Sequence, residues 1–310
     1  MRWGDMRQSD NVEDVTGGQP AGGGVPFGGG MKLGGGAMIL VVIVSLLFGV
    51  NPLQFLGMME GGAPTAPVPA PSPQVAPPGY GPQIAPPGQA PRATKNAEDP
   101  DKGLSVRVLG DTEDVWTALF QAMGSRYEPP KLVLFRKSVA SMCGRASSAA
   151  GPFYCPADRK LYLDTAFFQE LQTRFGAPGD FAQAYVIAHE VGHHVQNQMG
   201  TMREFNQAAD KLDDRRRNAL SVRLELQADC YAGVWGFYAA KRKLLDPGDA
   251  EEGLRAASAV GDDTIQKRTQ GYAVPDGFTH GTAEQRMKWF QTGMQSGDPR
   301  SCNTFAAKGP

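Results

Sequence analysis

The chain contains a long stretch without a charged side chain, Leu33–Met59. This stretch limits how the chain can fold, because an apolar segment of that length is expected to be buried in a membrane rather than exposed to water. Its central run, Met38–Val50, is apolar apart from one serine and one glycine. That run is shorter than the roughly 20 residues that span a bilayer as a helix, but the apolar residues Leu53–Met59 extend it to a full crossing. The part before it is long for a signal peptide, so we expect an uncleaved transmembrane anchor over residues 37–59, with a cleaved signal peptide as the alternative.

The chain before the anchor, residues 1–36, carries mixed charges and three glycine runs, a composition that predicts a disordered arm. Its basic residues Arg2, Arg7 and Lys32 precede the anchor, and no Lys or Arg follows until Arg92. This asymmetry favours a cytoplasmic N-terminus. We therefore expect a single-pass protein of a bacterial inner (cytoplasmic) membrane, with its C-terminal part periplasmic or extracellular.

The rest of the chain divides at a change in composition. Residues 60–94 are rich in proline and nearly free of charge, which is typical of an extended linker. Residues 95–310 are enough for one domain with its own core. Across the whole chain 31 basic and 32 acidic residues nearly cancel, so the charge gives no sign of a nucleic-acid partner.

The pattern of apolar residues in this domain is mostly helical. A short strand is expected at Leu132–Phe135, and a hairpin at Pro152–Cys155 and Lys160–Leu163 around a turn-prone tetrapeptide. Helices are expected over residues 111–123, 165–175, 180–199, 202–217, 219–245, 249–269 and 282–292. Several helices with a small sheet indicate an α+β fold.

One predicted helix carries an H-E-x-x-H motif, with His189, Glu190 and His193. Histidines four residues apart lie one turn above each other, so both rings can bind the same Zn²⁺ ion. Glu190 is rotated by about 100° from His189 and is placed to act as general base on a zinc-activated water. The adjacent His194 is offset by about 140° from His189, so we expect it to support a ligand or to be solvated.

A catalytic zinc ion keeps three protein ligands, so a third is needed. The next long helix places Glu225 and Asp229 four residues apart on one face, among apolar neighbours that predict burial. Two such carboxylates repel unless a cation or a donor lies between them. We expect Glu225 to bind zinc and Asp229 to accept the free ring N–H of a ligating histidine.

The fourth histidine, His280, lies just before a helix that Thr282 and Gln285 begin as a capping box. In that place a histidine could donate a hydrogen bond to the oxyanion of a substrate, with Arg286 nearby as a positive partner or structural clamp. From spacing alone, a solvated or capping histidine is an equal alternative.

Two further features concern the fold around this motif. The four cysteines form no C-x-x-C pair, and outside the cytoplasm they can pair in three ways, of which we favour Cys143 with Cys155 and Cys230 with Cys302. The segment Gly151–Tyr154 could be an edge strand on which an extended peptide substrate pairs.

Five segments together resemble the bacterial neutral zinc metallopeptidase family, a gluzincin-like group with H-E-x-x-H and a downstream E-x-x-x-D. The resemblance covers nearly the whole chain apart from the proline-rich linker. The segments are Met1–Trp3 with Ser9–Asp14, Gly151–Asp158, His189–Gln196, Glu225–Trp235 and His280–Arg286.

This resemblance implies a zincin-like domain with His189, His193 and Glu225 as zinc ligands and Glu190 as base. The chain is also similar to the CAAX-type prenyl proteases, in which a late histidine stands six residues before an arginine, as His280 and Arg286 do here. That similarity implies a catalytic role for His280, although Gly281 stands where those proteases have proline.

The function expected is that of a membrane-anchored zinc metallopeptidase, with a peptide or protein substrate and the lipid bilayer as partners. Zinc would activate a water, and Glu190 would take its proton. One alternative is a catalytically weak or inactive zinc-bound scaffold that binds a cell-envelope partner. An intact Glu190 argues against it, because a structural site needs no base. Another is hydrolysis of a different amide, such as one in the cell wall.

Overall fold

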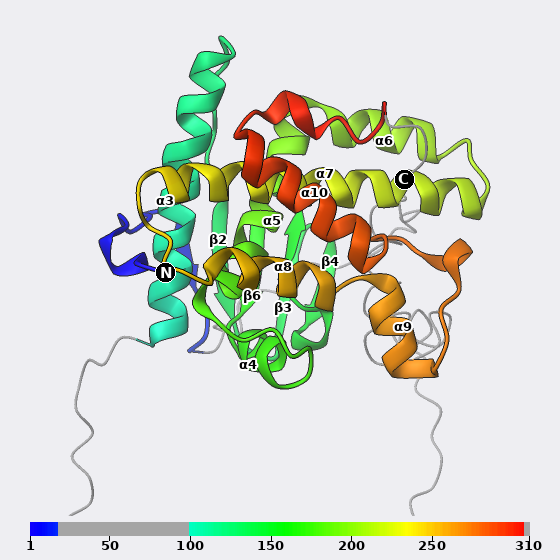
Figure 1. Ribbon diagram of the computed structural model, residues 1–310, viewed down its shortest axis with the longest axis horizontal. Coiled ribbons are helices and arrows are strands. Elements are labelled where there is room, and N and C mark those ends of the chain that lie inside the picture. The colour runs from blue at the N-terminus through cyan, green and yellow to red at the C-terminus, as the bar shows by residue number, and fades with distance from the viewer. Residues whose placement is uncertain (18–98, 307–310) are drawn as a thin grey trace, which may run out of the picture.

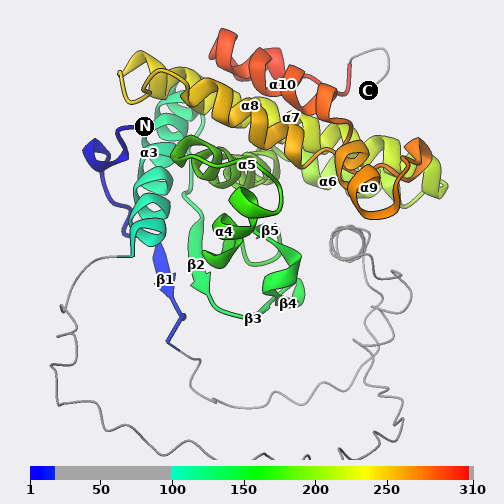
Figure 2. The same cartoon turned by 60° about the horizontal axis from the view of Figure 1, so that its bottom comes forward.

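A computed structural model describes residues 1–17 and 99–306, in which helices pack over a small sheet (Figures 1 and 2). The mostly helical α+β class is confirmed. The predicted anchor over residues 37–59 and the linker over residues 60–94 lie outside the described residues. Within the two described ranges, no helix is both long and apolar enough to span a membrane.

The main sheet has four strands in the order β1-β2-β6-β5. They are β1 (Val12–Asp14), β2 (Lys131–Phe135), β6 (Lys160–Asp164) and β5 (Phe153–Cys155). The first three run parallel, and β5 runs antiparallel to β6 at the edge, which confirms the predicted hairpin. A separate hairpin, β3 (Ser138–Ser141) and β4 (Gly144–Ser147), was not predicted.

The N-terminal arm, residues 1–17, is part of this fold, and the prediction of disorder over residues 1–36 is wrong for that part. A short 3-10 helix, Trp3–Asp5, leads to β1, which pairs with β2. The buried Glu113 accepts hydrogen bonds from the side chains of Arg7, Ser9 and Asn11. Composition could not reveal this, because the polar residues of the arm find their partners more than a hundred positions away.

In Figure 2 the helices lie mostly above the strands, apart from the short helix Ala166–Thr173, which is drawn at the level of the strands. They are α3 (Pro100–Ala122), α4 (Ala166–Thr173), α5 (Asp180–Met199), α6 (Thr201–Ala209), α7 (Asp214–Lys241), α8 (Asp249–Ala259), α9 (Asp262–Gln270) and α10 (Ala283–Ser296). The bounds of α5 are those predicted. The expected helix over residues 202–217 is instead α6 and the start of α7, and the one over 249–269 is broken between α8 and α9.

Glycines allow α7 and α10 to cross closely. A Cβ atom added at Gly233 of α7 would lie 2.1 Å from the carbonyl oxygen of Phe290, and one at Gly293 of α10 would lie 2.0 Å from that of Cys230. Only hydrogen fits at either position, so the two backbones are in direct contact. This crossing holds Arg286, near the start of α10, over the middle of α7.

Both disulfides have the predicted pairing. Cys143 joins Cys155 and so links the β3-β4 turn to β5. Cys230 of α7 joins Cys302, which ends a short 3-10 helix, Pro299–Cys302, near the C-terminus. The C-terminal segment is therefore fixed covalently to α7.

Candidate metal centre

Two helices supply the candidate ligands. His189 and His193 lie on buried positions of α5, and Glu225 lies on a buried position of α7. Gly192, between the histidines, allows the approach, because a Cβ atom there would lie 2.9 Å from the Ala228 oxygen of α7. The glycine in the H-E-x-x-H motif is therefore needed for helix contact rather than for chemistry.

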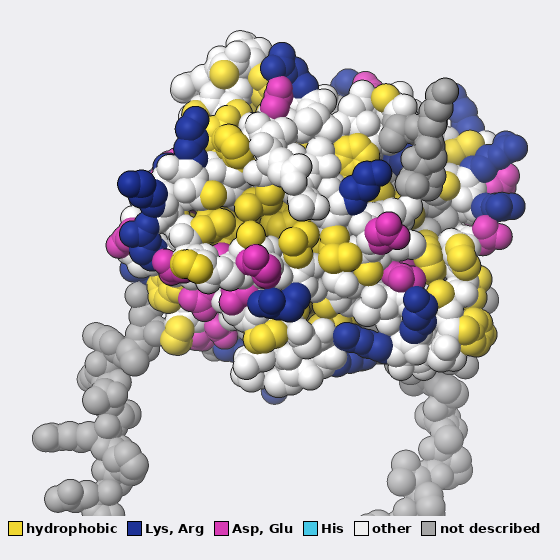
Figure 3. Space-filling view, viewed as in Figure 1, with side chains coloured by type: hydrophobic (Ala, Val, Ile, Leu, Met, Phe, Trp, Pro, Cys, Tyr) yellow, Lys and Arg dark blue, Asp and Glu magenta, His cyan; other side chains and the backbone are white. Residues whose placement is uncertain are grey.

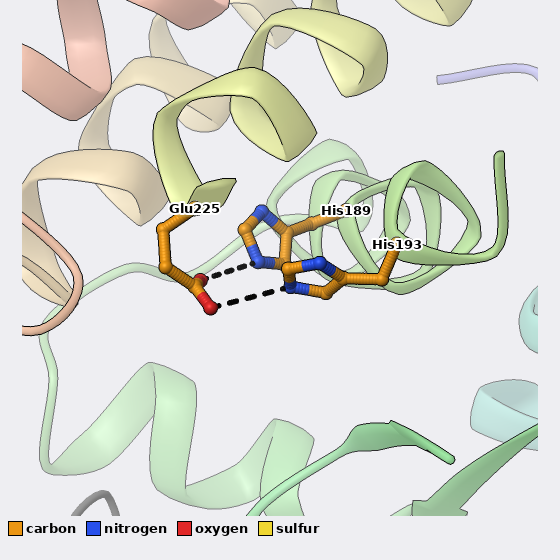
Figure 4. A group of neighbouring side chains, drawn as sticks. All are labelled: His189, His193 and Glu225. Carbon is orange, nitrogen blue, oxygen red and sulfur yellow. Dashed lines mark ion pairs between the residues drawn. The ribbon is translucent and has the colours of Figure 1, made fainter. Parts of the chain in front are cut away.

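The three side chains point at one another (Figure 4). The Nε2 atom of His189 lies 3.2 Å from Oε2 of Glu225, and Nε2 of His193 lies 3.5 Å from Oε1 of Glu225. All three ligand atoms are within 4.8 Å of one another. Ligands of a tetrahedral zinc ion, with bonds of about 2.1 Å, are about 3.4 Å apart, so the donor set and its spacing fit zinc.

The electrostatics of the centre favour a cation between these groups. Burial alone would lower the pKa of His189, but Asp229 and Glu225 together raise it to about 9. Burial would raise the pKa of Glu225, but His193 and His189 hold it well below the usual value. The positive charge stabilised here is a proton, and a metal ion would take the same place.

Asp229 holds the outer nitrogen of His189. Its Oδ1 atom lies 2.8 Å from His189 Nδ1, and its two oxygens accept hydrogen bonds of 2.8 and 2.9 Å from Arg286. Tyr185 also donates to Asp229, a contact that spacing did not predict. Burial would raise the pKa of Asp229, but Arg286 and His189 lower it to about 2, so the carboxylate stays charged. The predicted partners Asp229 and Arg286 thus bind each other beside the candidate ligand His189.

The outer nitrogen of His193 has a different partner. Its Nδ1 atom lies 2.9 Å from Oε1 of Gln196, one turn further along α5 and buried. Gln196 was not predicted, although its position three residues after the second histidine was a usable signal.

Glu190 lies beside the ligands without being held by them. It is partly exposed, and none of the described residues forms a hydrogen bond or ion pair with its carboxylate. Burial raises its pKa, while the two histidines oppose that shift. A carboxylate with a raised pKa and free oxygens is suited to accept a proton.

His280 lies in the loop before α10, near enough to Glu225 for their charges to interact. Its Nδ1 atom lies 3.0 Å from Oδ1 of Asp262, whose other oxygen accepts the backbone N–H groups of Thr279, His280 and Gly281. Burial would lower the pKa of His280, but Asp262 raises it above the usual value, with a smaller contribution from Glu225. The sequence analysis did not identify Asp262, whose role depends on the break between α8 and α9.

His194 does not face the candidate ligands. Its Nδ1 atom lies 3.1 Å from the Tyr154 hydroxyl oxygen of β5, and its Nε2 lies 2.7 Å from the Glu128 carbonyl. The expectation that it is solvated is wrong, since it is 1% exposed, and burial lowers its pKa to about 4. It is a neutral residue that joins α5 to the edge strand.

That edge strand lies beside α5. The candidate segment Gly151–Tyr154 includes the start of β5, which has a strand on one side only among the described elements. The side-chain amide of Asn197 on α5 also donates to the Tyr154 hydroxyl.

One face of the molecule is shown in Figure 3. Lys and Arg side chains are interspersed with Asp and Glu over it, and no histidine is visible. His189 and His193 are buried, 7% and 9% exposed. The candidate centre is therefore covered from this side.

Comparison with known proteins shows similarity over nearly the whole length. The model of the family described as "Putative neutral zinc metallopeptidase" matches residues 1–305. The chain is 43% identical over 307 residues to "Uncharacterized protein YpfJ" of Escherichia coli K12, covering 98% of this chain and 99% of the relative. It is 44% identical over 224 residues to "Uncharacterized protein Rv2575" of Mycobacterium tuberculosis H37Rv, covering 69% and 74%. No solved structure matches the chain significantly.

Proposed function

The chain belongs to the neutral zinc metallopeptidase family, and from this premise we propose that it is a zinc-dependent peptidase that hydrolyses peptide bonds. The observation that carries the proposal is the convergence of His189, His193 and Glu225 beside Glu190, whose carboxylate has no partner among the described residues. A structural zinc site normally has four protein ligands and needs no base.

The residues of the chain divide the chemistry among them. His189, His193 and Glu225 would hold the zinc ion, which when bound acts as a Lewis acid that acidifies water and polarises a carbonyl group. Glu190 takes a proton from the attacking water and passes it to the leaving amine. Asp229 and Arg286 keep the His189 ring in place.

His280 would stabilise the oxyanion of the substrate. Asp262 accepts the hydrogen on the Nδ1 atom of His280, so Nε2 is the nitrogen left to face a substrate, and it donates only when the ring is protonated. Because Asp262 also raises the pKa of this ring, the protonated form, which donates from both nitrogens, is favoured. A donor aimed at developing negative charge is worth roughly 10²- to 10³-fold in rate.

The edge strand β5 supports an extended peptide as the substrate. One side of this strand has no neighbouring strand among the described elements, and it lies next to the helix that bears both histidines. A peptide that pairs with it would be held by backbone hydrogen bonds.

We propose further that the domain works outside the cytoplasm, at the outer face of a bacterial inner membrane. The support is the pair of disulfides, which persist in oxidising compartments and are rare in the cytosol.

The test is cleavage of a diverse peptide mixture by the full-length, zinc-loaded protein, followed by mass spectrometry. Glu190→Gln is expected to keep its zinc and lose at least about 100-fold in rate, because it removes the base. Glu251→Gln, on the exposed face of α8, is the matched control and should cleave like the wild type. Equal cleavage by Glu190→Gln would exclude this mechanism, and no cleavage by zinc-loaded wild type would favour the scaffold alternative.

A further inference from the structure

The second candidate ligand, His193, stands at one end of a chain of buried hydrogen bonds. Oε1 of Gln196 faces its Nδ1 atom at 2.9 Å. The side-chain nitrogen of Gln196 donates to the carbonyl oxygen of Leu224 at 2.7 Å and to Oε1 of Gln227 at 3.1 Å. The nitrogen of Gln227 donates in turn to the carbonyl oxygen of Cys302 at 3.0 Å. Gln196 and Gln227 are 0% and 7% exposed, so water does not replace these contacts.

The direction of every bond in this chain is determined by its ends. A backbone carbonyl can only accept, so the Cys302 and Leu224 oxygens each require the nitrogen of a glutamine amide. That requirement fixes the orientation of both amides, which is otherwise an open assignment. Oε1 of Gln196 must then face His193, and the hydrogen of this imidazole must be on Nδ1. The Nε2 atom that faces Glu225 keeps its lone pair for a metal ion.

The end of this series of hydrogen bonds that is farthest from His193 is held by a disulfide. Cys230 lies three residues after Gln227 on α7 and is joined to Cys302, whose carbonyl accepts from Gln227. The hydroxyl of Thr304, two residues further, donates to the Arg223 carbonyl at 2.6 Å. The disulfide and this hydrogen bond therefore fix the position of the Cys302 carbonyl relative to α7.

We propose that Gln196, Gln227 and the Cys302 carbonyl form a relay that holds His193 in its Nδ1–H tautomer, which makes the Cys230–Cys302 disulfide a positioning element of the metal centre. The two candidate histidines are thus held by different means, His189 by the charged Asp229 and His193 by neutral amides. This inference rests on the proposed zinc site and goes beyond it, because it gives roles to residues to which neither the motif nor the resemblance assigns one.

The first experiment measures zinc affinity in the full-length protein by competition with a chromogenic chelator. Gln196→Leu removes the acceptor for His193 and is expected to weaken zinc binding by about 10- to 100-fold. Gln196→Glu keeps an acceptor for His193 but places its second oxygen against the oxygens of Leu224 and Gln227, so it should recover only part of that loss. Gln227→Leu leaves Gln196 bonded to Leu224 and should weaken binding by a smaller factor. Circular dichroism confirms that each variant is folded.

The second readout is the tautomer itself. Ring ¹⁵N chemical shifts distinguish Nδ1–H from Nε2–H imidazole, and His193 should show hydrogen on Nδ1 in the metal-free wild type, where no ion on Nε2 fixes the tautomer. A side chain that only filled space would leave this signature unchanged when replaced by leucine. In Gln196→Leu we expect the Nδ1–H signal to broaden or disappear.

The third experiment tests the link to the disulfide. Replacing Cys230 and Cys302 by serine should weaken zinc binding to the level of Gln227→Leu, and adding Gln227→Leu to that pair should weaken it no further, because both changes act on one relay. Replacing Cys143 and Cys155 by serine is the matched control, since that disulfide holds no residue of the relay, and zinc affinity should not change.

The outcomes separate this inference from the proposed function. If the wild type binds zinc tightly and Gln196→Leu binds it equally well with Nδ1–H retained, the relay is wrong and the zinc site stands. Additive effects of the serine pair and Gln227→Leu would disconnect the disulfide from the centre. If the wild type binds no zinc, both proposals fail.

A second inference concerns the N-terminal arm, residues 1–17, and rests on different contacts. The buried carboxylate of Glu113 in α3 receives its side-chain hydrogen bonds from three arm residues, Arg7, Ser9 and Asn11. Gly110 of α3 allows the arm to pass, because a Cβ atom there would lie 2.5 Å from the Arg7 oxygen. Without the arm, a buried charge would be left without these partners, which is strongly unfavourable.

The arm also contacts α5 and the segment after α7; these two helices carry the candidate ligands. The backbone N–H of Arg2 donates to the Leu244 carbonyl after α7, and the indole N–H of Trp3 donates to Asp180 in the first turn of α5. Arg7, one of the basic residues from which the orientation across a membrane was predicted, is paired with Glu113 and Asp114. The charge of Arg7 stabilises the folded protein through these ion pairs, so its presence is weak support for a cytoplasmic location of the arm.

We infer that residues 1–17 and the metal centre lie in the same compartment. One folded body cannot be divided by a bilayer, so between the two described parts the chain would cross a membrane an even number of times or not at all. The predicted topology, with the N-terminus in the cytoplasm and the catalytic domain outside after one crossing, is incompatible with the pairing of β1 and β2.

The test is labelling of single introduced cysteines in spheroplasts with a maleimide that cannot cross the cytoplasmic membrane. Asp10→Cys reports the arm and Glu251→Cys reports the domain, and both positions are exposed. The wild type is the control, because its four cysteines are paired. We expect both variants to label at the same step, either before or after permeabilisation. Labelling of Glu251→Cys in intact spheroplasts and of Asp10→Cys only after permeabilisation would overturn the inference.

Discussion

Among single side chains, Asp229 connects three groups at the candidate centre. It accepts from His189, Arg286 and Tyr185, which belong to α5 and α10, while it lies on α7 itself. Arg286 is 4% exposed, so its charge depends on this carboxylate for compensation. One side chain thus orients a candidate ligand and neutralises a buried guanidinium.

Asp229→Asn is therefore expected to damage both stability and metal binding. It leaves the buried Arg286 without a counter-charge, which should lower the free energy of unfolding by about 3 kcal/mol. Zinc affinity should fall by about 10-fold or more, because the amide holds His189 less firmly. Urea unfolding and chelator competition measure the two effects. Asp298→Asn breaks the exposed pair with Arg300 and should change neither quantity; an equal effect of the two variants would contradict the argument.

His194 gives a prediction for acid. Burial lowers its pKa from 6.5 to about 4, so between these values the unfolded chain binds a proton that the folded chain does not. Its contribution to stability is full above pH 6.5 and is lost as the pH falls towards 4, by about 2 kcal/mol at pH 5. His194→Gln keeps a donor and an acceptor without titrating. Urea unfolding at pH 7 and pH 5 should show a larger acid loss in the wild type than in this variant, and equal losses would show that His194 does not titrate as described.

Among elements, the crossing of α5 and α7 determines whether the ligands meet. The backbones of the two helices approach closely where Gly192 of α5 lies against Ala228 of α7. Glu225 lies about one turn before Ala228 on α7. Any side chain at residue 192 moves the carboxylate away from both histidines.

Gly192→Ala should therefore weaken zinc binding although it changes no ligand. The added methyl group meets backbone atoms at 2.9 and 3.1 Å, so the helices must separate by a few tenths of an ångström. Overpacking of this kind lowers stability by about 1–3 kcal/mol. Gly4→Ala, whose Cβ would meet nothing within 4 Å, is the control for the substitution itself. Chelator competition and thermal unfolding measure both variants, and unchanged zinc affinity in Gly192→Ala would show that the helices can adapt.

The same elements show what a sequence can and cannot predict. Helix α5 and the hairpin of β5 and β6 depend on local patterns and were predicted. The favoured cysteine pairing was also correct, although Cys230 and Cys302 are 72 residues apart. The break between α8 and α9 was not predicted, because a Cβ atom at Gly261 would lie 2.4 Å from the backbone nitrogen of Ala283, a neighbour only in the folded chain. Asp262 was missed for the same reason, since its partner His280 comes from another element, whereas Gln196 lies one turn after its partner His193 on the same helix.

For the whole molecule, the N-terminal arm, residues 1–17, completes the sheet and the core of the domain formed by the C-terminal part of the sequence. It supplies the outer strand β1, hydrogen-bond donors to Glu113 and the buried Met6 of the core. A domain defined by residues 95–310 alone therefore lacks part of its sheet and part of its core.

A protein that begins at Ala93 should accordingly be less stable than the full chain. It leaves Glu113 unpaired and one side of β2 without a neighbour, so we expect a lower Tm. A synthetic peptide of residues 1–17 added in excess should raise the Tm again, because a ligand that binds only the folded state stabilises it by mass action. A peptide with Arg7, Ser9 and Asn11 replaced by alanine is the control. No shift with the native peptide would mean that the arm contributes little.

The contact between Arg2 and Leu244 also has a consequence for the order of events during synthesis. Arg2 leaves the ribosome long before Leu244 exists, and Asn11 must wait for Leu132, to which its carbonyl is bonded at 2.8 Å. The arm cannot reach its final place until most of the chain has been translated. Until then its strand is an unpaired edge that other chains could bind, so nascent chains stalled before Leu244 should depend on chaperones more than completed ones do.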